Sequence, residues 1–295
     1  METLFIIGNG FDLWHNLPTS YSNFYQHSRE VLDELENYYH VGIDDDCPWR
    51  DFENVLGTYA WKTMYDQFDF TNPMSASFKV SETYGLEDEI SEQTDNLMRA
   101  IDDGFRDWIS EIDVDSANKK ITFPDGARFL TFNYTPTLQD VYKIDDERIL
   151  HIHGRVDDNT PLIFGHGEKI VELPEQDENG DSNRTMFTDA ENAAKSPLRA
   201  FQKPVEKIIT RNKSYFAGLR DIREIVIIGF SLSDIDLPYI ETIARQTIDC
   251  QWTVYCRTDS SVSRFKSQLA NCGITDGQII TRGYEEPLFW PMGTL

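Results

Sequence analysis

Short apolar runs recur along the chain and predict the strands of a β-sheet. They are rich in Ile, Val, Phe and Leu and occupy residues 4–7, 128–132, 149–153, 162–164, 225–230, 251–256 and 278–281. Several of these runs are apolar at consecutive positions instead of alternate ones, which is typical of strands covered on both faces in a parallel sheet. We therefore expect a mostly parallel sheet with helices on both of its faces.

Apolar positions at helical spacing predict amphipathic helices between the strands. The first set is Phe24, Val31, Leu32, Leu35, Tyr38 and Tyr39, the second is Ile90, Leu97, Ile101, Phe105, Trp108 and Ile112, and the third is Leu198, Phe201, Val205, Ile208 and Ile209. Strands that alternate with helices indicate an α/β protein, here with a Rossmann-like sheet.

The spacing of the first two strands predicts an insertion. More than 100 residues separate them, far more than one crossover helix requires. We expect a single domain over residues 1–295 with a helical insertion at about 21–120. Within it, residues 81–115 carry twelve acidic and two basic side chains, which is typical of a solvated helix face, with a docking face for a basic partner as the alternative. The polar stretch 172–184 predicts an exposed loop or lid.

Composition excludes several classes of protein. The 51 acidic and 27 basic residues give a formal charge of -24, so we expect neither a nucleic acid nor an anionic membrane as a partner. No run of about 18 apolar residues could span a bilayer, and METLFIIGNGFDL lacks the basic start of a signal peptide. Four cysteines are too sparse for a disulfide scaffold, which favours a reducing cytoplasm.

A glycine-containing turn follows the first predicted strand. The motif GNGFD supplies Gly8, Asn9, Gly10, Phe11 and Asp12. Glycines after a strand let backbone N–H groups approach a phosphate, so the motif is a candidate nucleotide-binding loop. A plain tight turn is the alternative, because the full GxGxxG spacing is absent.

The second strand ends in TFNYT, which contains Thr131, Asn133 and Tyr134. Ligands of open α/β sheets bind at such strand ends, so Asn133 is a candidate catalytic residue, and Thr131 and Tyr134 are candidate binding residues. The alternative is that Asn133 caps a helix that begins near Pro136.

Histidines cluster after the next strand, in HIHG and IFGHG. His151, His153 and His166 fall within sixteen residues. His153 precedes a glycine and suits a general base or a ribose-binding group, and His166 is a further candidate for binding. A metal site of His151 and His153 with Asp157 or His166 is the alternative. His15, His27 and His40 are interpreted as structural or exposed.

A second glycine turn follows the strand at 225–230, in the sequence IIGFSLSDIDLPYI. Gly229, Ser231 and Asp236 are candidate phosphate or ribose contacts at the start of a helix. Ordinary helix capping is the alternative, and we favour it for Asp236.

The order of these motifs resembles the AbiH-like phage abortive-infection family over nearly the whole chain. The landmarks are GNGFD, NLPTSY, TFNYTPTL, HIHG, IFGHG and IIGFSLSDIDLPYI. The same landmarks are more distantly similar to the sirtuin-type NAD-binding fold, at Gly8-Asn9-Gly10, Asn16-Leu17-Pro18, Asn133, His153-Gly154 and Gly229-Phe230-Ser231.

What the resemblance implies is an enzyme that acts on NAD. The four cysteines of the sirtuin zinc ribbon are missing from this sequence. The resemblance to sirtuin-like domains of defence proteins therefore implies hydrolysis of NAD instead of protein deacylation. Asn133 and His153 become the catalytic pair and Asp12 lies near the developing positive charge. The loop of residues 8–10 and Ser231 hold the pyrophosphate.

The expected function is therefore an NAD glycohydrolase that releases nicotinamide and ADP-ribose as an antiphage effector, with NAD as substrate and no metal. Such an activity implies control by a protein partner, by oligomerisation or by a nucleotide signal, and the acidic insertion is the candidate docking face. Two alternatives stay open: a sensor that binds NAD or ADP-ribose without turnover, and a metal-dependent hydrolase built on the histidines.

Overall fold

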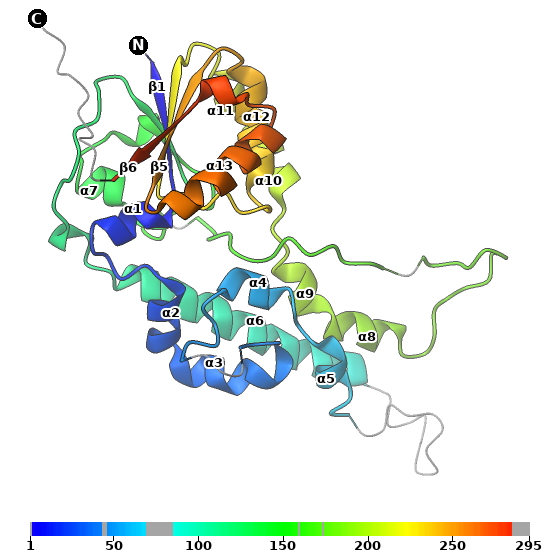
Figure 1. Cartoon of the computed structure of the whole chain (residues 1–295). Coiled ribbons are helices and arrows are strands. Elements are labelled where there is room, and N and C mark those ends of the chain that lie inside the picture. The colour runs from blue at the N-terminus through cyan, green and yellow to red at the C-terminus, as the bar shows by residue number, and fades with distance from the viewer. Residues whose placement is uncertain (1, 43–45, 69–84, 159, 173, 285–295) are drawn as a thin grey trace, which may run out of the picture. The chain divides into compact units, whose positions relative to one another are not determined.

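The computed structural model describes residues 2–42, 46–68, 85–158, 160–172 and 174–284 (Figure 1). The chain divides into two compact units, which are described separately. The sheet unit comprises Met1–Ser20, Ile109–Ile163 and Pro204–Leu295, and the helical unit comprises Tyr21–Trp108 and Phe164–Lys203. The helical unit thus combines residues from the expected insertion with a second segment that lies after the third strand.

The sheet unit is built on an all-parallel sheet, which confirms the predicted α/β fold. In the described residues it has six strands in the order β3-β2-β1-β4-β5-β6. Their bounds are β1 Thr3–Ile7, β2 Arg128–Thr131, β3 Ile149–His151, β4 Glu224–Ile228, β5 Gln251–Cys256 and β6 Ile279–Gly283. The strand order reverses direction between β1 and β4, the point at which open α/β sheets bind ligands.

Helices cover both faces of this sheet (Figure 1). The central strands β1 and β4 are apolar toward both faces, because consecutive residues of a strand point to opposite sides. Leu4 and Ile6 of β1 belong to one core cluster, which also takes side chains from α10 Val205–Arg211, α11 Lys213–Ala217, α12 Leu237–Gln246 and α13 Asp259–Asn271. Phe5 and Ile7 belong to the other, with α1 Asn9–Trp14 and α7 Thr137–Asp140. Each such buried side chain stabilises the fold by roughly 1.5–3 kcal/mol.

One predicted strand is wrong. Among the described residues, 162–164 pair with no strand, although the N–H of Ile163 donates to the carbonyl of His153 at 2.8 Å. The run passes from one unit to the other, so its apolar side chains serve two cores. Ile163 packs against the core of the sheet unit, and Phe164 contacts Phe52 and Phe105 of the helical unit.

The helical unit is organised around aromatic side chains. Its helices are α2 Tyr21–His27, α3 Arg29–Leu35, α4 Phe52–Leu56, α5 Trp61–Tyr65, most of α6 Leu86–Ser110, α8 Thr188–Ala194 and α9 Ser196–Ala200. Phe24, Phe52 and Phe105 bring together α2, α4 and α6, with ring centroids 4.9 to 5.7 Å apart. Short 3₁₀ turns lie at Glu36–Tyr38, Val114–Ser116, Asp146–Arg148 and Asp276–Gln278 across the two units.

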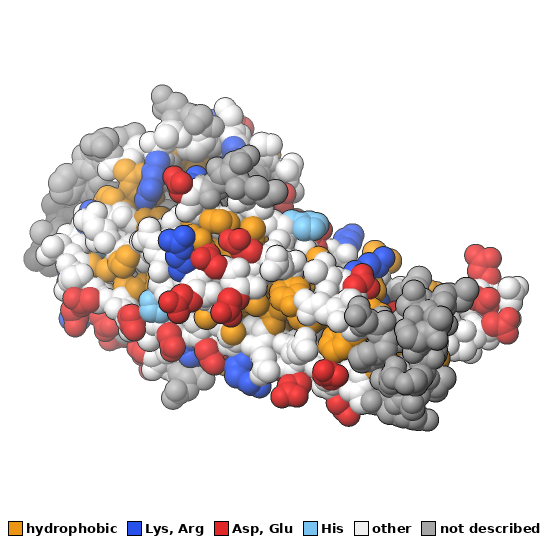
Figure 2. Space-filling model, turned by 90° about the horizontal axis from the view of Figure 1, so that it is seen from below, with side chains coloured by type: hydrophobic (Ala, Val, Ile, Leu, Met, Phe, Trp, Pro, Cys, Tyr) orange, Lys and Arg blue, Asp and Glu red, His pale blue; other side chains and the backbone are white. Residues whose placement is uncertain are grey.

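The acidic side chains of α6 are solvated, as their pattern predicts. They are all exposed, and Figure 2 shows Asp and Glu side chains distributed across one face with apolar side chains between them. Residues 81–84 of the acidic stretch, and Leu173 of the expected loop, lie outside the described residues. The rest of the stretch 172–184 is exposed, as expected. Among the described helices, none is both long and apolar enough to cross a membrane.

Candidate functional site

The two glycine turns of the sheet unit lie against each other where β1 and β4 end. The N–H of Gly8 donates to the carbonyl of Ile228 at 3.1 Å, and the N–H of Gly10 donates to the carbonyl of Gly229 at 2.7 Å. Gly229 has φ +67°, and a Cβ there would lie 2.1 Å from the nitrogen of Phe11. Glycine is therefore needed at this position for close contact between the two loops.

The contacts of the predicted phosphate loop are largely internal. The N–H groups of Gly8 and Gly10 are already donated to β4 and its loop. The side chain of Asn9 donates to the carbonyl of Thr19 at 2.6 Å. Phe11 is fully buried in the sheet-unit core, beside His15 and Tyr142. These two glycines thus bring two loops together, and their N–H groups are not the donors for an anion.

Asp12 follows this loop and is 1% exposed. The hydroxyl of Thr135 donates to its Oδ2 at 2.5 Å and lies 3.0 Å from the hydroxyl of Thr137. Burial raises the pKa of Asp12 from 3.8 to about 6, and hydrogen bonding from these threonines, with a smaller contribution from Asn133, offsets part of that rise. Oδ1 makes no hydrogen bond of normal geometry with the described residues.

Asn133 lies at the end of β2, and its amide is buried. Neither the oxygen nor the nitrogen of the amide makes a hydrogen bond of normal geometry within the described chain. The N-cap residue of α7 is Pro136, so Asn133 does not cap this helix. Buried amides are almost always paired in folded proteins. An unpaired one beside a strand end is therefore a candidate ligand contact.

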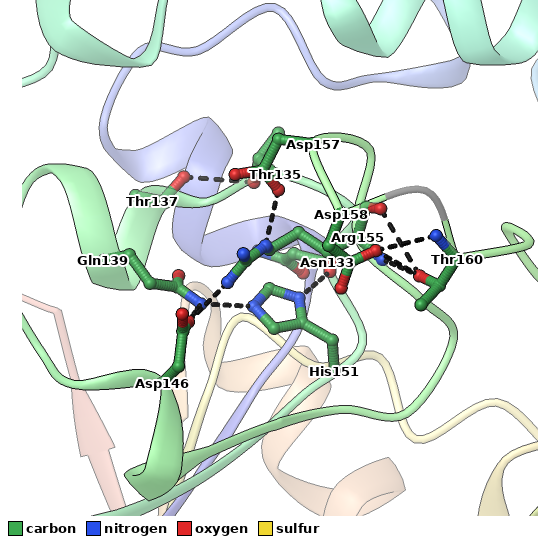
Figure 3. Close-up of polar contacts among 10 residues, drawn as sticks. All are labelled: Asn133, Thr135, Thr137, Gln139, Asp146, His151, Arg155, Asp157, Asp158 and Thr160. Carbon is green, nitrogen blue, oxygen red and sulfur yellow. Dashed lines mark hydrogen bonds and ion pairs between the residues drawn. The ribbon is translucent and has the colours of Figure 1, made fainter.

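A polar network holds the backbone of Asn133 in place (Figure 3). The Nδ1–H of His151 donates to the carbonyl of Asn133 at 3.0 Å, and Nε2 accepts from the amide of Gln139 at 3.0 Å. Gln139 also donates to Asp146, which accepts from Arg155 at 2.5 Å. Burial lowers the pKa of His151 to about 4, so its ring is neutral at physiological pH.

This network also bears on the metal alternative, because both ring nitrogens of His151 are already hydrogen-bonded. His166 belongs to the helical unit, where Nδ1 accepts from the N–H of Glu168 at 3.1 Å and Nε2 donates to the carbonyl of Leu198 at 2.8 Å. The residues described here contain no group of three or more His, Cys, Asp or Glu that could hold a metal ion. His151 and His166 therefore each use both ring nitrogens in hydrogen bonds within their own unit.

His153, which follows β3, lies opposite the carboxylate of Asp236, which lies between β4 and α12. Its Nε2 lies 3.8 Å from Oδ1 of Asp236, and both side chains are buried. The hydroxyl of Ser233 donates to Oδ2 of Asp236 at 2.8 Å. Asp236 occupies the N-cap position of α12 but makes no capping hydrogen bond with its side chain. The prediction that the Asp236 side chain caps a helix is therefore wrong, because its carboxylate faces His153.

Aromatic rings surround the imidazole of His153. Phe132 and Tyr239 lie edge-on to it, with centroids 5.2 and 5.8 Å away, and the ring of Tyr134 lies 6.5 Å away. Phe132 stacks on Phe230 at 4.1 Å. This apolar surrounding strengthens the attraction between the imidazole and the Asp236 carboxylate relative to water.

The remaining predicted residues take supporting places. The hydroxyl of Thr131 accepts from the N–H of Asn133 at 3.1 Å, and the hydroxyl of Tyr134 donates to the carbonyl of Ile163 at 3.0 Å. Ser231 is exposed on the β4 loop.

Sequence reasoning missed three contributors, Thr135, Thr137 and Ser233. The signal was present, because the two threonines closely follow Asn133 in NYTPT and Ser233 precedes Asp236 by three residues.

Comparison with known proteins identifies the family. Searches of curated proteins and of solved structures returned no significant match. A scan against protein-family models matches residues 4–256 to the family described as bacteriophage abortive infection AbiH. This range begins in β1, ends with β5 and contains Asp12, Asn133, His153 and Asp236. The chain therefore belongs to the AbiH family of bacteriophage abortive infection proteins.

Proposed function

We propose that this AbiH protein acts in abortive infection by hydrolysing NAD to nicotinamide and ADP-ribose. The observation that carries the proposal is the buried, incompletely hydrogen-bonded pair of Asp12 and Asn133 at the carboxyl edge of a parallel sheet. Removing these polar groups from water costs free energy unless a ligand completes their hydrogen bonds. The distant similarity of the sequence motifs to sirtuin-type NAD-binding domains supports NAD as that ligand.

Asp12 and Asn133 have distinct roles in the proposed reaction. Breaking the bond between nicotinamide and C1′ of the ribose builds positive charge on the sugar and releases neutral nicotinamide. The carboxylate of Asp12, ionised above a pKa of about 6, stabilises this charge from a buried position where electrostatic interactions are strong. The amide of Asn133 orients a ribose hydroxyl or the attacking water through its oxygen and nitrogen, which make no hydrogen bond of normal geometry within the described chain.

His153 is the proposed general base. Neutral His153 accepts a proton from the water as the water oxygen bonds to C1′, so the products are ADP-ribose, nicotinamide and one proton that later returns to solvent. The imidazolium formed in this step lies 3.8 Å from Oδ1 of Asp236. Asp236 is thus a positioning residue that orients the imidazole and offsets its positive charge.

A sensor that binds NAD or ADP-ribose without turnover is the second candidate. It would use the same incompletely hydrogen-bonded amide and carboxyl and would show stoichiometric binding without product. The metal-dependent alternative is less supported, because His151 and His166 each use both ring nitrogens within the chain.

Control of the activity is part of the proposal, because unrestrained hydrolysis of NAD would harm an uninfected cell. We assign this control to a basic protein partner from the same defence system, acting in the cytoplasm. The exposed acidic side chains of α6 are its expected docking face. Oligomerisation and a nucleotide signal are the other routes to be tested.

The test is chromatographic measurement of nicotinamide and ADP-ribose released from NAD by the full chain. Asn133→Ala and His153→Ala should each lower kcat by about 10² to 10⁴. Arg245→Ala, on an exposed part of α12, is the control and should retain the wild-type rate. Wild-type activity in either site variant contradicts the assignment, and tight binding of NAD without product supports the sensor.

Asp236→Asn separates positioning from folding. The substitution preserves shape but removes the charge that faces His153, so kcat should fall by about 10²-fold while KM and the thermal unfolding midpoint stay near their wild-type values. Equal losses in kcat and in the unfolding midpoint would instead indicate that Asp236 has a structural role.

A further inference from the structure

Two arginines are attached to the paired glycine turns of the sheet unit. Arg257 directly follows β5, and its Nη2 donates to the carbonyl of Gly10 at 3.1 Å. Arg264 lies on α13, and its Nη2 donates to the carbonyl of Ser231 at 3.3 Å. The two acceptors belong to the loops that touch through Gly10 and Gly229. Both guanidinium groups therefore lie at the switch point between β1 and β4.

The two arginines make no ion pair with a carboxylate of the described residues. Each makes its polar contact with a backbone oxygen. Other cations of the same unit are paired, as Arg155 is with Asp146 and Lys266 is with Asp276. In a chain with a formal charge of -24, two exposed arginines that make no ion pair within the described residues form a local positive site at this edge of the sheet.

Their donors are suited to an anion. A guanidinium has five N–H donors, and each arginine uses one of them in its contact with the loop. Both side chains are exposed, so the other donors are accessible. The N–H groups of Gly8 and Gly10 are already used within the fold, so a phosphate here needs side-chain donors instead.

We propose that Arg257 and Arg264 form the subsite for the pyrophosphate of the nucleotide. The inference rests on the proposed function and extends it, because it assigns the anionic part of the substrate to residues outside the catalytic group. Guanidinium groups bind phosphate oxygens in bidentate fashion. They also attract the dianionic ligand toward an otherwise strongly acidic protein.

The test is calorimetric titration of the full chain with ADP-ribose, inorganic pyrophosphate and nicotinamide riboside, which lacks the pyrophosphate. Arg257→Gln and Arg264→Gln should each weaken ADP-ribose binding by about 10-fold, the size expected for a partly solvated hydrogen bond to a charged group. The double variant should also lose pyrophosphate binding and show a shallower dependence of affinity on salt. Arg245→Gln is the matched control, and nicotinamide riboside should bind all variants equally.

The outcomes separate this inference from the proposed function. Unchanged affinities for ADP-ribose and pyrophosphate in the double variant overturn the inference, even where nicotinamide is still released. Absence of binding of both ligands to the wild type overturns it as well. Arginine-dependent binding of pyrophosphate without any NAD turnover supports the anion subsite and contradicts the proposed glycohydrolase activity. If the double variant binds NADP more weakly but ADP-ribose with unchanged affinity, the arginines contact the 2′-phosphate of NADP, which contradicts the pyrophosphate assignment.

Discussion

Replacing Asp12 with Asn should change how the stability of the protein depends on pH. The carboxyl is 1% exposed, and burial raises its pKa from 3.8 to about 6. The difference of about two pKa units, at 1.36 kcal/mol each, corresponds to about 3 kcal/mol. Asparagine has nearly the same shape and can still accept from the hydroxyl of Thr135, but it has no charge to bury.

The sign follows from proton binding. The folded protein holds the Asp12 proton more tightly than the unfolded chain, so below about pH 4 both states are protonated and burial of the carboxyl carries no charge penalty. Between about pH 4 and 6 the unfolded chain ionises first, and the wild type loses stability. Above about pH 6 the full penalty of about 3 kcal/mol is present.

The assay is urea unfolding followed by circular dichroism at pH 4, 5, 6 and 7. The free energy of unfolding of Asp12→Asn minus that of the wild type should grow by about 3 kcal/mol from pH 4 to pH 7. Any constant effect of the new amide cancels in this comparison. Asp221→Asn, at an exposed position, should run parallel to the wild type. Parallel curves for Asp12→Asn would refute the assignment of a buried ionisable carboxyl.

Three further predictions address the site and its support. In the activity assay, kcat/KM for nicotinamide release should rise about tenfold per pH unit below about pH 6 and level off above it, because the proposed mechanism requires ionised Asp12. A flat profile would contradict this role. Gly229→Ala should lower the free energy of unfolding by at least about 2 kcal/mol, because φ is +67° and the new Cβ overlaps backbone atoms. The control Gly277→Ala has open space around the new Cβ, so its free energy of unfolding should stay within about 0.5 kcal/mol of the wild-type value. Glu53→Gln should lower the free energy of unfolding in urea by about 3 kcal/mol, because the side chain of Lys203 is 1% exposed and its ammonium lies 2.8 Å from the carboxylate of Glu53. Wild-type stability would show that this ion pair is dispensable.

The pattern of the chain was sufficient for the fold class and for part of the site. Consecutive apolar residues in β1 and β4 identify strands buried on both faces, which requires helices on each side. The same logic places Asp12, Asn133 and His153 after strands whose carboxyl ends share one edge. Residues 162–164 mark the limit of this reasoning, because a short apolar run has the same composition whether it pairs in a sheet or fills two cores.

Which side chains meet at that edge was decided by tertiary structure. Thr135 and Asp12 are separated by 123 positions in the sequence, yet they share a hydrogen bond because β1 and β2 are neighbours in the sheet. Asp236 precedes a helix in a sequence that fits capping equally well, and only the position of His153 shows that its carboxylate is used elsewhere. Local sequence determines the elements and their buried faces, whereas strand order brings distant polar groups together, and no local pattern encodes that order.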